Sequence, residues 1–527
     1  MISNFVLILL QILLGLLALP ITSTVAVVFV SIDCGSSKSF IDDKHNITWV
    51  GDDQYIKSGE SRAVQAAPES SISPIYSTLR VFPTRNKNCY SINAGGKGQR
   101  VLLRAYFYYG NYDGKMSPPT FDLQFDGNDW VKGVNASGGP SYYEVIYVTK
   151  FDSLSVCLAQ TEDNQYPFIN GINVRSLDLG LYSDIDSGRP LFTRDRINYG
   201  GDKILRYPDD PYDRFWFPDK GGNRLSTVKR DSLNTVVEFS NKPPRSALLT
   251  AMTTDNSATL DLNLYFPKTE ITIYIILYFV ELLDQSNSDR TFFLYINEEA
   301  SFDPITLQYG GAAYKYVVAK ASSGTVFSLR SSSDSALPPL INALELFSVG
   351  PSLTNGTLNK DVRALALLQK TFTQLQEWSG DPCLPEKFTW DWVECSYQNT
   401  PRITRLKLND LGLKGSLPDF SALDALQQID LHNNLLTGKI PDFLGDFPNL
   451  NSLNLENNTF SGSIPASLTN NNNLKLKVSD YSSGTCASQP CKPSNNRTSN
   501  SPPSSKKSES LLILLGMIPV FVLIQYS

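Results

Sequence analysis

Apolar side chains near the C-terminal end of the chain recur with a period of 24 residues, so that Leu426, Leu450 and Leu474 open three successive units. The first two units share a longer pattern, in which Leu431, Asn434, Leu436, Gly438, Ile440 and Pro441 return as Leu455, Asn458, Phe460, Gly462, Ile464 and Pro465. A period of this length predicts a solenoid whose stacked units bury one continuous apolar core. Each short strand leaves alternate side chains on an open face, which is suited to binding.

An earlier copy of the unit, one residue shorter, runs from Ile403 to Pro418. The shared order L-x-x-L-x-L-x-x-N-x-L-x-G-x-I-P resembles the plant extracellular class of leucine-rich repeats. The resemblance implies that the Gly-x-Ile-Pro segment forms a second structured side of each coil. Residues 401–485 would hold about three repeats and the start of a C-terminal cap. Because three units are near the minimum for a stable solenoid, we expect caps at both ends.

The segment before the repeats, residues 351–400, combines a linker helix with an N-terminal cap. Near-helical spacing of apolar residues predicts a helix over Asp361 to Trp378, which Gly380, Asp381 and Pro382 end. The apolar residues that define this spacing are Val362, Leu365, Leu368, Phe372 and Leu375.

Cysteine positions predict disulfides at both ends of the repeats. Cys383 and Cys395 enclose two tryptophans, and a bond between them would cover the first repeat, whereas Cys486 and Cys491 would close a small loop after the last one. Metal binding by these cysteines is the disfavoured alternative, because no histidine lies near them.

Three further cysteines lie in the N-terminal region, and the total of seven leaves one thiol unpaired or linked to another chain. We favour a bond between Cys89 and Cys157 with Cys34 free, although the sequence leaves all three pairings open. Asn-x-Ser/Thr sequons agree with an oxidising, secretory route and predict glycosylation at Asn46, Asn135, Asn355, Asn457 and Asn496.

Residues 27–350 are predicted to be mainly β. Short apolar or alternating runs between Gly, Pro, Asn and Asp predict strands, and no long helical pattern interrupts them. The runs are Phe29 to Ile32, Val101 to Tyr109, Thr120 to Phe125, Glu144 to Thr149, Ser155 to Leu158, Thr235 to Phe239, Ile271 to Phe279, Thr291 to Ile296 and Val326 to Leu329. This length exceeds one β-sandwich, so we expect two, at 27–185 and 186–350, divided between Tyr182 and Arg189.

Several segments resemble the plant malectin-like ectodomain family: Phe29 to Gly35, Thr48 to Asp53, Arg104 to Gly114, Pro167 to Asn170, and Arg206 to Arg214. In that family two malectin-like β-sandwiches lie in tandem, and Gly380-Asp381-Pro382-Cys383 resembles the motif that joins them to leucine-rich repeats in receptor kinases. A Gly-rich loop with a following Lys and a His-Arg-Asp segment are missing, so we expect neither kinase activity nor any other enzymatic activity.

The resemblance also implies a carbohydrate site, because animal malectin holds a glucose disaccharide with aromatic side chains and an Asp. Tyr rings suit the apolar face of a sugar while amide and carboxylate groups bind its hydroxyls. The candidate residues are Tyr106, Tyr108, Tyr109, Asn111, Tyr112 and Asp113 in the first sandwich and Tyr278 and Phe279 in the second. Strand alternation and turn formation offer a packing role instead. The cleft between the sandwiches is a third candidate.

On the repeats, the variable strand positions are candidates for contact with a protein partner, the alternative being a solvated face. These positions are Arg405, Lys407, Asn409, Gln428, Asp430, His432, Ser452, Asn454 and Glu456. Three repeats present a small surface, so a partner there would touch the sandwiches too.

Other chemistry has little support in the sequence. The two histidines, His45 and His432, lie near no nucleophile motif, and Gly95 to Gly98 lacks the spacing of a phosphate loop. Asp209, Asp210 and Asp213 are acidic enough for calcium, but the Pro and Tyr residues between them favour a structured loop. A net charge of −6 offers no basic surface for nucleic acid, and no cofactor or metal is implied.

Both ends of the chain carry targeting patterns. The apolar run Phe5 to Leu19 followed by Thr24-Val25-Ala26 predicts a signal peptide over residues 1–26, a retained anchor being the alternative. Residues 486–510 form a Ser/Pro/Asn-rich stalk, and residues 511–527 a short apolar tail. This arrangement predicts a glycosylphosphatidylinositol anchor at Ser499 or Asn500 on the outer face of the plasma membrane, with a short membrane anchor as the alternative.

Three functions remain. The first is a cell-surface receptor-like protein or co-receptor, in which the malectin-like part binds a cell-wall oligosaccharide or peptide and the repeats bind a receptor kinase or other membrane protein. The second is a structural binder of cell-wall polysaccharide without signalling. The third, a glycan-active enzyme, has only unpaired acidic residues in its favour.

Overall fold

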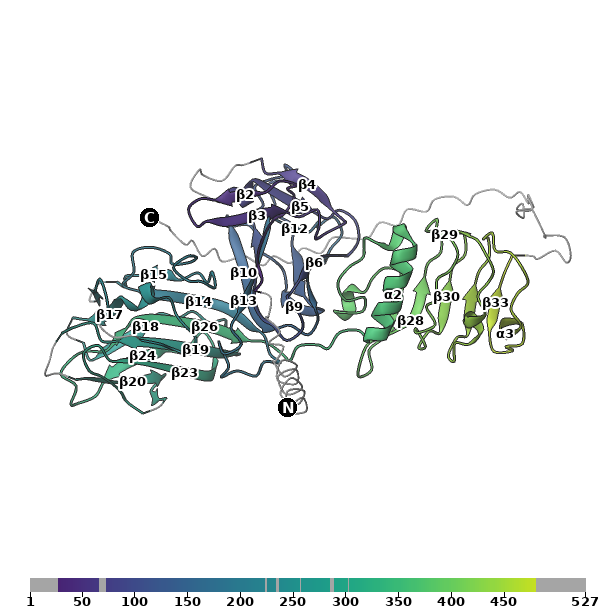
Figure 1. The fold of residues 1–527 in the computed structure, drawn as a ribbon. Helices are drawn as coiled ribbons and strands as arrows, with labels where there is room; N and C mark the ends of the chain where they lie inside the picture. Colours follow the sequence, from purple (N-terminus) through teal and green to yellow (C-terminus); the bar gives the residue numbers. More distant parts are fainter. Residues whose placement is uncertain are drawn as a thin grey trace, which may run out of the picture. The chain divides into compact units, whose positions relative to one another are not determined.

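The computed structural model describes residues 27–65, 73–222, 225–233, 237–255, 257–284, 289–301 and 303–479 (Figure 1). The leader, the Cys486–Cys491 loop, Asn496, Ser499, Asn500 and the apolar tail lie outside these residues. Within the described ranges, no helix has the length and apolar character needed to cross a bilayer.

The first half of the β-rich region packs two sheets around a hydrophobic core. One sheet has the strand order β2-β3-β1-β13-β7-β10 in this half, and the facing sheet has the order β6-β11-β8-β9. Leu103 and Val145 from the first sheet meet Phe121 and Val156 from the second, all fully buried. The elements are β1 (Phe29–Asp33), β2 (Phe40–Asp42), β3 (Ile47–Gly51), β4 (Glu60–Ala63), η1 (Pro74–Ser77), β5 (Thr78–Val81), β6 (Lys87–Asn93), β7 (Arg100–Phe107), β8 (Phe121–Phe125), β9 (Asn128–Val131), β10 (Ser141–Val148), β11 (Ser153–Gln160), β12 (Phe168–Ile169) and β13 (Gly171–Leu177).

The second half builds its core around β19, whose residues from Ile273 to Val280 are all fully buried between β23 and β26. The predicted strand over Thr235 to Phe239 lies partly outside the described residues. Residues 237–239 are irregular, not strand, and Phe239 packs its ring against Tyr278. The elements are β14 (Leu191–Tyr199), β15 (Phe217–Asp219), β16 (Leu225–Lys229), η2 (Arg245–Leu248), β17 (Thr250–Thr254), β18 (Thr259–Leu262), β19 (Ile271–Val280), β20 (Arg290–Ile296), β21 (Glu299–Ala300), β22 (Ile305–Leu307), β23 (Ala312–Ala321), β24 (Phe327–Ser331), β25 (Leu340–Ile341) and β26 (Ala343–Val349).

One sheet runs through both halves. Val145 and Ile146 of β10 pair with Phe192 and Leu191 of β14, and this short antiparallel contact joins the strands into an 11-stranded sheet. Beyond these two pairs β10 and β14 separate. The point of separation is where a cavity opens, as described below.

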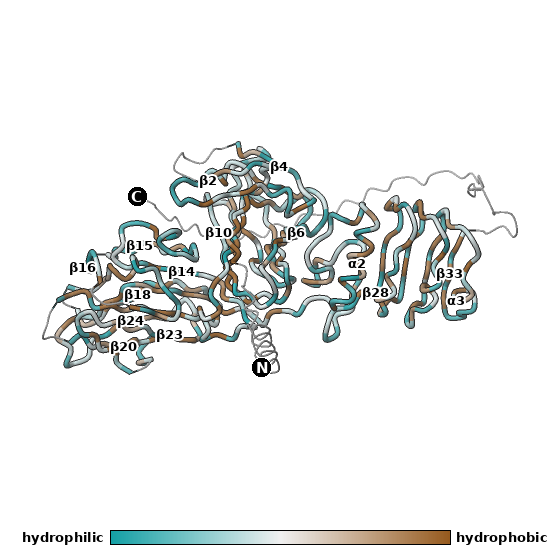
Figure 2. The backbone as a smooth tube through the Cα atoms, in the orientation of Figure 1, coloured by the Kyte–Doolittle hydropathy of each residue, from teal (hydrophilic) through white to brown (hydrophobic). Residues whose placement is uncertain are grey.

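The repeats form a parallel ladder, β28-β30-β32-β33, preceded by the antiparallel β27. Leu406, Ile429 and Leu453 lie in register and are buried, while brown apolar and teal polar positions alternate along these coils in Figure 2. The elements are α2 (Asn359–Thr371), η3 (Thr373–Leu375), η4 (Glu386–Phe388), β27 (Val393–Ser396), β28 (Arg402–Lys407), β29 (Lys414–Gly415), β30 (Gln428–Asp430), β31 (Leu435–Leu436), η5 (Asp442–Gly445), β32 (Ser452–Asn454), α3 (Ala466–Thr469) and β33 (Lys475–Lys477).

The linker helix is shorter than predicted. Helix α2 ends at Thr371, and Phe372 adopts an extended backbone before the short 3-10 turn η3. Phe372 and Leu375 are nevertheless buried, because the turn carries them back onto the core that Leu365 and Leu368 begin. The apolar spacing was therefore informative about burial but not about where the helix ends.

Two asparagines, the buried Asn434 and the half-buried Asn458, tie their coils of the repeats to the one before. The Nδ2 atom of Asn434 donates to the carbonyl of Leu408 at 2.7 Å and to that of Leu431 at 2.9 Å, while its Oδ1 accepts the N–H of Leu413. Asn458 repeats these contacts one coil later, and its Nδ2 donates to Leu431 and Leu455. These side chains satisfy turn backbone groups that would otherwise be buried without partners.

Two disulfides are formed among the described cysteines, Cys89–Cys157 and Cys383–Cys395, and Cys34 is a buried free thiol. This is the pairing favoured from the sequence. Cys89 and Cys157 are directly opposite each other on β6 and β11. The bond therefore joins neighbouring strands of one sheet.

Candidate functional site

A cluster of buried charges fills the outer face of the first sheet beneath the segment Arg206 to Phe215. Five arginines and four carboxylates form connected ion pairs there. They are Arg104, Arg175, Arg196, Arg206, Arg214, Glu144, Asp210, Asp213 and Glu345. All but Arg206 are fully or nearly fully buried. Buried charges of this kind need mutual compensation, and the cluster supplies it.

Asp213 is the centre of one half of the cluster. Its Oδ2 accepts hydrogen bonds from Arg175 at 2.8 Å and 3.1 Å, and its Oδ1 accepts from Arg206 at 3.0 Å. Burial opposes ionisation of this carboxyl, but the surrounding Arg175, Arg104 and Arg206 hold its pKa below the usual value. Asp213 is therefore a buried carboxylate anion.

Glu144 and Glu345 extend the cluster into the second half. Arg196 donates to Glu144 and to Glu345, each at 2.7 Å, and so bridges β10 and β26. Arg214 donates to Asp210 at 2.8 Å. The two cores are thus joined by charge pairs as well as by the short β10–β14 contact.

These pairings decide the role of the three aspartates considered for calcium. The carboxylate oxygens of Asp210 and Asp213 accept hydrogen bonds from arginines and from Trp216. Asp209 is exposed and pairs with Lys203. In the part of the chain that the structure describes, no cluster of acidic, His or Cys side chains could hold a metal ion. The segment is a structured loop, as its Pro and Tyr content suggested.

The predicted sugar-binding segment of the first half divides between two environments. Tyr106 is buried among Trp49, Tyr76 and Tyr142, and its hydroxyl donates to Asn173 at 2.6 Å. Tyr108 is half-buried, with its ring against Tyr76 and its backbone N–H bonded to Asn170. Of the two, only Tyr108 offers partly exposed surface to a ligand.

Tyr109, Asn111, Tyr112 and Asp113 lie in the turn that follows β7. Tyr109 is buried and its hydroxyl donates to Asp113, whose carboxylate also accepts the N–H of Lys115. Asn111 accepts the N–H of Met116 at 2.8 Å, and Tyr112 packs its ring against Phe168. Most polar groups of this segment therefore stabilise the turn itself, while Asn111, Tyr112 and Asp113 keep partial exposure.

Tyr278 and Phe279 do not form an exposed platform. Both side chains are fully buried, the Tyr278 hydroxyl donates to Glu345 at 2.9 Å, and Phe279 packs against Phe292. Every residue of β19 from Ile273 to Val280 is fully buried, so both faces of the strand are covered at this point. The expectation of a sugar site at this pair is corrected to a packing role.

A cavity that the sequence analysis did not find opens where β10 and β14 separate. It has a volume of about 240 Å³ and is lined by Trp130, Val131, Tyr142, Tyr143, Glu144, Phe192, Thr193 and Arg194. The lining comes from the consecutive strands β9 and β10 and from β14, which follows much later in the sequence. The sequence suggests the cleft between the two halves as a third candidate for a ligand site. It does not show which residues line such a cleft, because that depends on how β9, β10 and β14 pair with their neighbours.

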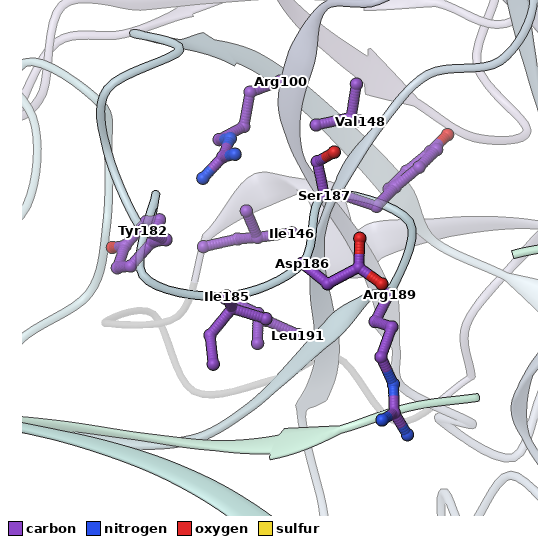
Figure 3. A pocket seen from close by; sticks show the side chains of 10 residues that line it. Arg100, Ile146, Val148, Tyr182, Ile185, Asp186, Ser187, Arg189 and Leu191 are labelled. Carbon is purple, nitrogen blue, oxygen red and sulfur yellow. The ribbon is translucent and has the colours of Figure 1, made fainter. Parts of the chain in front are cut away.

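A second hollow lies between Arg100, Ile146, Tyr182 and Asp186, and Figure 3 shows its lining side chains. Its volume is about 10 Å³, which is no more than one water molecule needs. This hollow is too small to be a ligand site.

On the repeats, the predicted contact positions lie in rows across the parallel strands. Arg405, Gln428 and Ser452 form one row and Lys407, Asp430 and Asn454 the next, with Asn409, His432 and Glu456 following. All are half-buried. Lys407 pairs with Glu394 at 2.6 Å, and Lys475 and Lys477 extend the first two rows.

His432 lies at the centre of an acidic patch on this face. Its Nδ1 is 2.6 Å from Asp430 Oδ1, and its Nε2 is 3.6 Å from Asp410 Oδ2. The hydrogen bond to Asp430, with the charges of Asp430, Asp410 and Glu456, raises the pKa of His432 above 6.5. The charge of His432 is therefore expected to change near neutral pH.

Four of the predicted glycosylation sites lie in the described part of the chain, and their asparagine side chains are open to solvent. Asn46, Asn135, Asn355 and Asn457 are exposed. Their positions are therefore compatible with glycan attachment.

Comparison with known sequences agrees with the architecture. The profile of the malectin-like domain matches residues 32–349, and the leucine-rich repeat profile matches residues 425–447 and 449–471. The chain belongs to the malectin-like domain family. The buried charge cluster and the cavity at β10 and β14 both lie within its malectin-like region.

Receptor kinases are among the curated relatives of this chain. A probable LRR receptor-like serine/threonine-protein kinase of Arabidopsis thaliana is 35% identical over 430 residues, covering 76% of this chain and 48% of the relative. The LRR receptor-like serine/threonine-protein kinase IOS1 of Arabidopsis thaliana is 31% identical over 405 residues, covering 74% and 45%. The chain thus spans about half the length of the curated relatives it matches.

Solved structures share the fold of the malectin-like region. The ANXUR1 extracellular domain from Arabidopsis thaliana aligns with a TM-score of 0.53 at 20% identity, covering 62% of this chain and 100% of that chain. The plant receptor-like kinase FER aligns with a TM-score of 0.54 at 20% identity, covering 63% and 98%. FER has also been solved in complex with the plant peptide RALF23 and LLG2.

Proposed function

We propose that this protein is a receptor-like recognition protein at the extracellular face of the plasma membrane. Its malectin-like region, arranged as two sandwiches, binds a peptide or a cell-wall carbohydrate, and its repeats contact a membrane partner through which any signal passes. The observation that carries the proposal is the combination, in one chain, of a malectin-like region with an open repeat face. Receptor kinases with the same combination are its relatives.

The exposed chemistry supports recognition. Tyr108, Tyr112 and the cavity at β10 and β14 offer aromatic surface beside hydrogen-bonding groups, which suits either a sugar or a peptide. On the repeats, half-buried charged and polar side chains in rows present a surface typical of protein contact rather than of a core. The complex of FER with RALF23 and LLG2 is a precedent, in a protein of the same fold, for a peptide ligand with a further partner.

A catalytic role has weak support. His45 pairs with Asp42 and His432 with Asp430 and Asp410, and the nearby carboxylates of the malectin-like region are neutralised by arginines. The side-chain partners of both histidines are aspartates, with neither a Ser nor a Cys among them in the described part of the chain. We therefore propose binding without chemistry.

Calorimetry tests the first part of the proposal. The full chain is titrated with a panel of cell-wall oligosaccharides and with RALF23, and Tyr108→Ala and Tyr112→Ala serve as site variants. Saturable binding that one variant weakens locates a site in the first half, whereas binding of neither class argues against ligand recognition by this region.

Association with a receptor kinase tests the second part. A ligand that binds in calorimetry is added to the full chain and the ectodomain of a receptor kinase such as FER, and complex formation is followed by analytical ultracentrifugation. Ligand-dependent association supports a signalling role. Ligand binding without any association favours the alternative, a structural polysaccharide binder.

A further inference from the structure

Two β-bulges converge on the cavity where β10 and β14 separate. On β9, Leu123 pairs with Val131 and Gln124 with Asp129, so Trp130 is the extra residue. On β14, Thr193 pairs with Phe347 and Asp195 with Leu346, so Arg194 is the extra residue. Both extra residues line the cavity. A bulge redirects a side chain and is common beside functional sites, so two bulges aimed at one cavity point to a built site.

The cavity has room for one side chain rather than for a large ligand. Its volume of about 240 Å³ lies below the roughly 300–1,000 Å³ typical of pockets for drug-sized molecules. Its walls are aromatic, with Tyr142, Tyr143 and Phe192 half-buried and Trp130 exposed by only 9%. Such walls favour an inserted aromatic or aliphatic group.

Arg194 places a positive charge at the cavity that can pair with a ligand. Arg194 is exposed, and it donates hydrogen bonds to two neutral groups, the carbonyl of Tyr265 at 3.2 Å and Ser348 Oγ at 3.5 Å. Among the described residues, none forms an ion pair with Arg194. The Glu144 carboxylate already accepts hydrogen bonds from Arg104, Arg196 and Thr193. The neighbouring Asp195 acts on Arg194 only at longer range, so a ligand would meet a guanidinium that can still accept a direct ion pair, which favours a carboxylate.

One wall of the cavity is an open strand edge. Strand β9 is the last strand of the order β6-β11-β8-β9, so within the described residues no strand pairs with its outer edge. Main-chain donors and acceptors on an open edge can pair with an extended chain, while a neighbouring pocket receives one of its side chains. A sugar could stack on the aromatic walls and bind single main-chain groups, but only an extended peptide can pair along the whole edge as a further strand.

We propose that this cavity binds an extended peptide segment that lies along β9, places an aromatic side chain in the cavity and pairs an adjacent Asp or Glu with Arg194. This inference rests on the proposed recognition function and names its ligand class and site. It identifies Trp130 as the wall that the inserted ring meets and Arg194 as the residue that selects charge.

A charge-reversal experiment tests the site. The probe is a library of fluorescein-labelled hexapeptides with one Phe or Tyr, followed by Asp in one half of the library and by Lys in the other, with β-branched residues elsewhere. Binding to the full chain is measured by fluorescence anisotropy for the natural sequence, for Arg194→Glu and for the control Arg363→Glu, which makes the same charge change on the exposed side of α2. Circular dichroism establishes that each variant is folded.

We expect the Asp peptides to bind best and to lose about tenfold in affinity in Arg194→Glu, because one attractive pair becomes repulsive. The Lys peptides should gain affinity in that variant, and Arg363→Glu should change neither. N-methylation of alternate residues of the best peptide should weaken binding by about tenfold in one alternation and little in the other, because only one set faces β9.

Other outcomes overturn the proposal. No peptide binding by the library excludes this ligand class, and if oligosaccharides bind in the same assay the recognition function survives without it. Peptide binding that is indifferent to Arg194→Glu, or to the position of N-methylation, places the site elsewhere while leaving recognition intact. If neither peptides nor oligosaccharides bind the natural chain, both the inference and the proposed function are contradicted.

Discussion

Arg175 and Asp213 form a buried ion pair in which Nη2 lies 2.8 Å from Oδ2, and both side chains are fully buried. Arg175 belongs to β13 in the first half, whereas Asp213 lies in the segment between β14 and β15 of the second. The pair therefore holds together parts of the chain that belong to different cores. The pair fixes the position of the segment between β14 and β15 against β13, and it has no role in chemistry.

Replacing Asp213 by Asn should destabilise the malectin-like region by about 3–5 kcal/mol, because the buried Arg175 and the half-buried Arg206 would lose their anionic partner. Guanidinium denaturation followed by tryptophan fluorescence measures the change. Asp209→Asn is the matched control, since Asp209 is exposed and pairs only with Lys203. Equal stability of the two variants would show that the cluster contributes nothing net.

The stability contribution of Asp126 should depend on pH. Burial raises its pKa from 3.8 to about 6, although Ser155 and Tyr147 donate to it. Between these values the folded state holds a proton that the unfolded state releases, so stability falls as pH rises through about 6. Relative to Asp126→Asn, the natural chain should lose on the order of 2–3 kcal/mol between pH 4 and pH 7. A constant difference across that range in denaturation experiments would contradict the raised pKa.

His432 should titrate above its ordinary value, and Asp430→Asn should return its pKa toward 6.5 by removing the main hydrogen-bond partner. The C–H signals of the imidazole in NMR spectra recorded across pH report the midpoint directly. Asp442→Asn, on a different side of the repeat in η5, is the control. An unchanged midpoint in Asp430→Asn would mean that the 2.6 Å contact does not persist in solution.

Gly380→Ala should cost about 2–4 kcal/mol, because an added Cβ would lie 2.6 Å from the Sγ of Cys89 and the backbone has φ of +74°. Gly412→Ala separates the two causes. It has a similar φ of +63° but meets nothing within 4 Å, so it should cost only about 1 kcal/mol. Thermal unfolding of both variants measures the difference, and equal losses would attribute the whole effect to the backbone.

Cys34 should resist alkylation while the protein is folded, because the thiol is fully buried and desolvation raises its pKa well above 9.0. Iodoacetamide treatment of the full chain followed by peptide mass spectrometry should label Cys34 only after denaturant is added. Labelling of the native protein would indicate local opening of the core next to β1.

Much of the fold could be predicted because its signals are local. The repeat period placed Leu406, Ile429 and Leu453 in one core, and apolar runs located most strands. The segment from Arg206 to Arg214 was singled out by sequence, but its role was not, because its arginine and aspartate side chains find partners on three other strands, β7, β13 and β26. Tyr278 was misjudged because both faces of β19 are covered by other parts of the chain, and a strand's own sequence does not show what packs on its second face. Trp130 and Arg194 carry no sequence signal at all, since a bulge exists only relative to the neighbouring strand.

The asparagines of the repeats give the solenoid a direction. Asn434 reaches back to Leu408 and Asn458 reaches back to Leu431, so each coil receives part of its hydrogen bonding from residues synthesised after it. A coil that has just left the ribosome is therefore incomplete until the next one follows. Maturation of the repeats should accordingly lag one coil behind translation, and a chain interrupted within a coil would leave the preceding coil, as well as the broken one, unfinished.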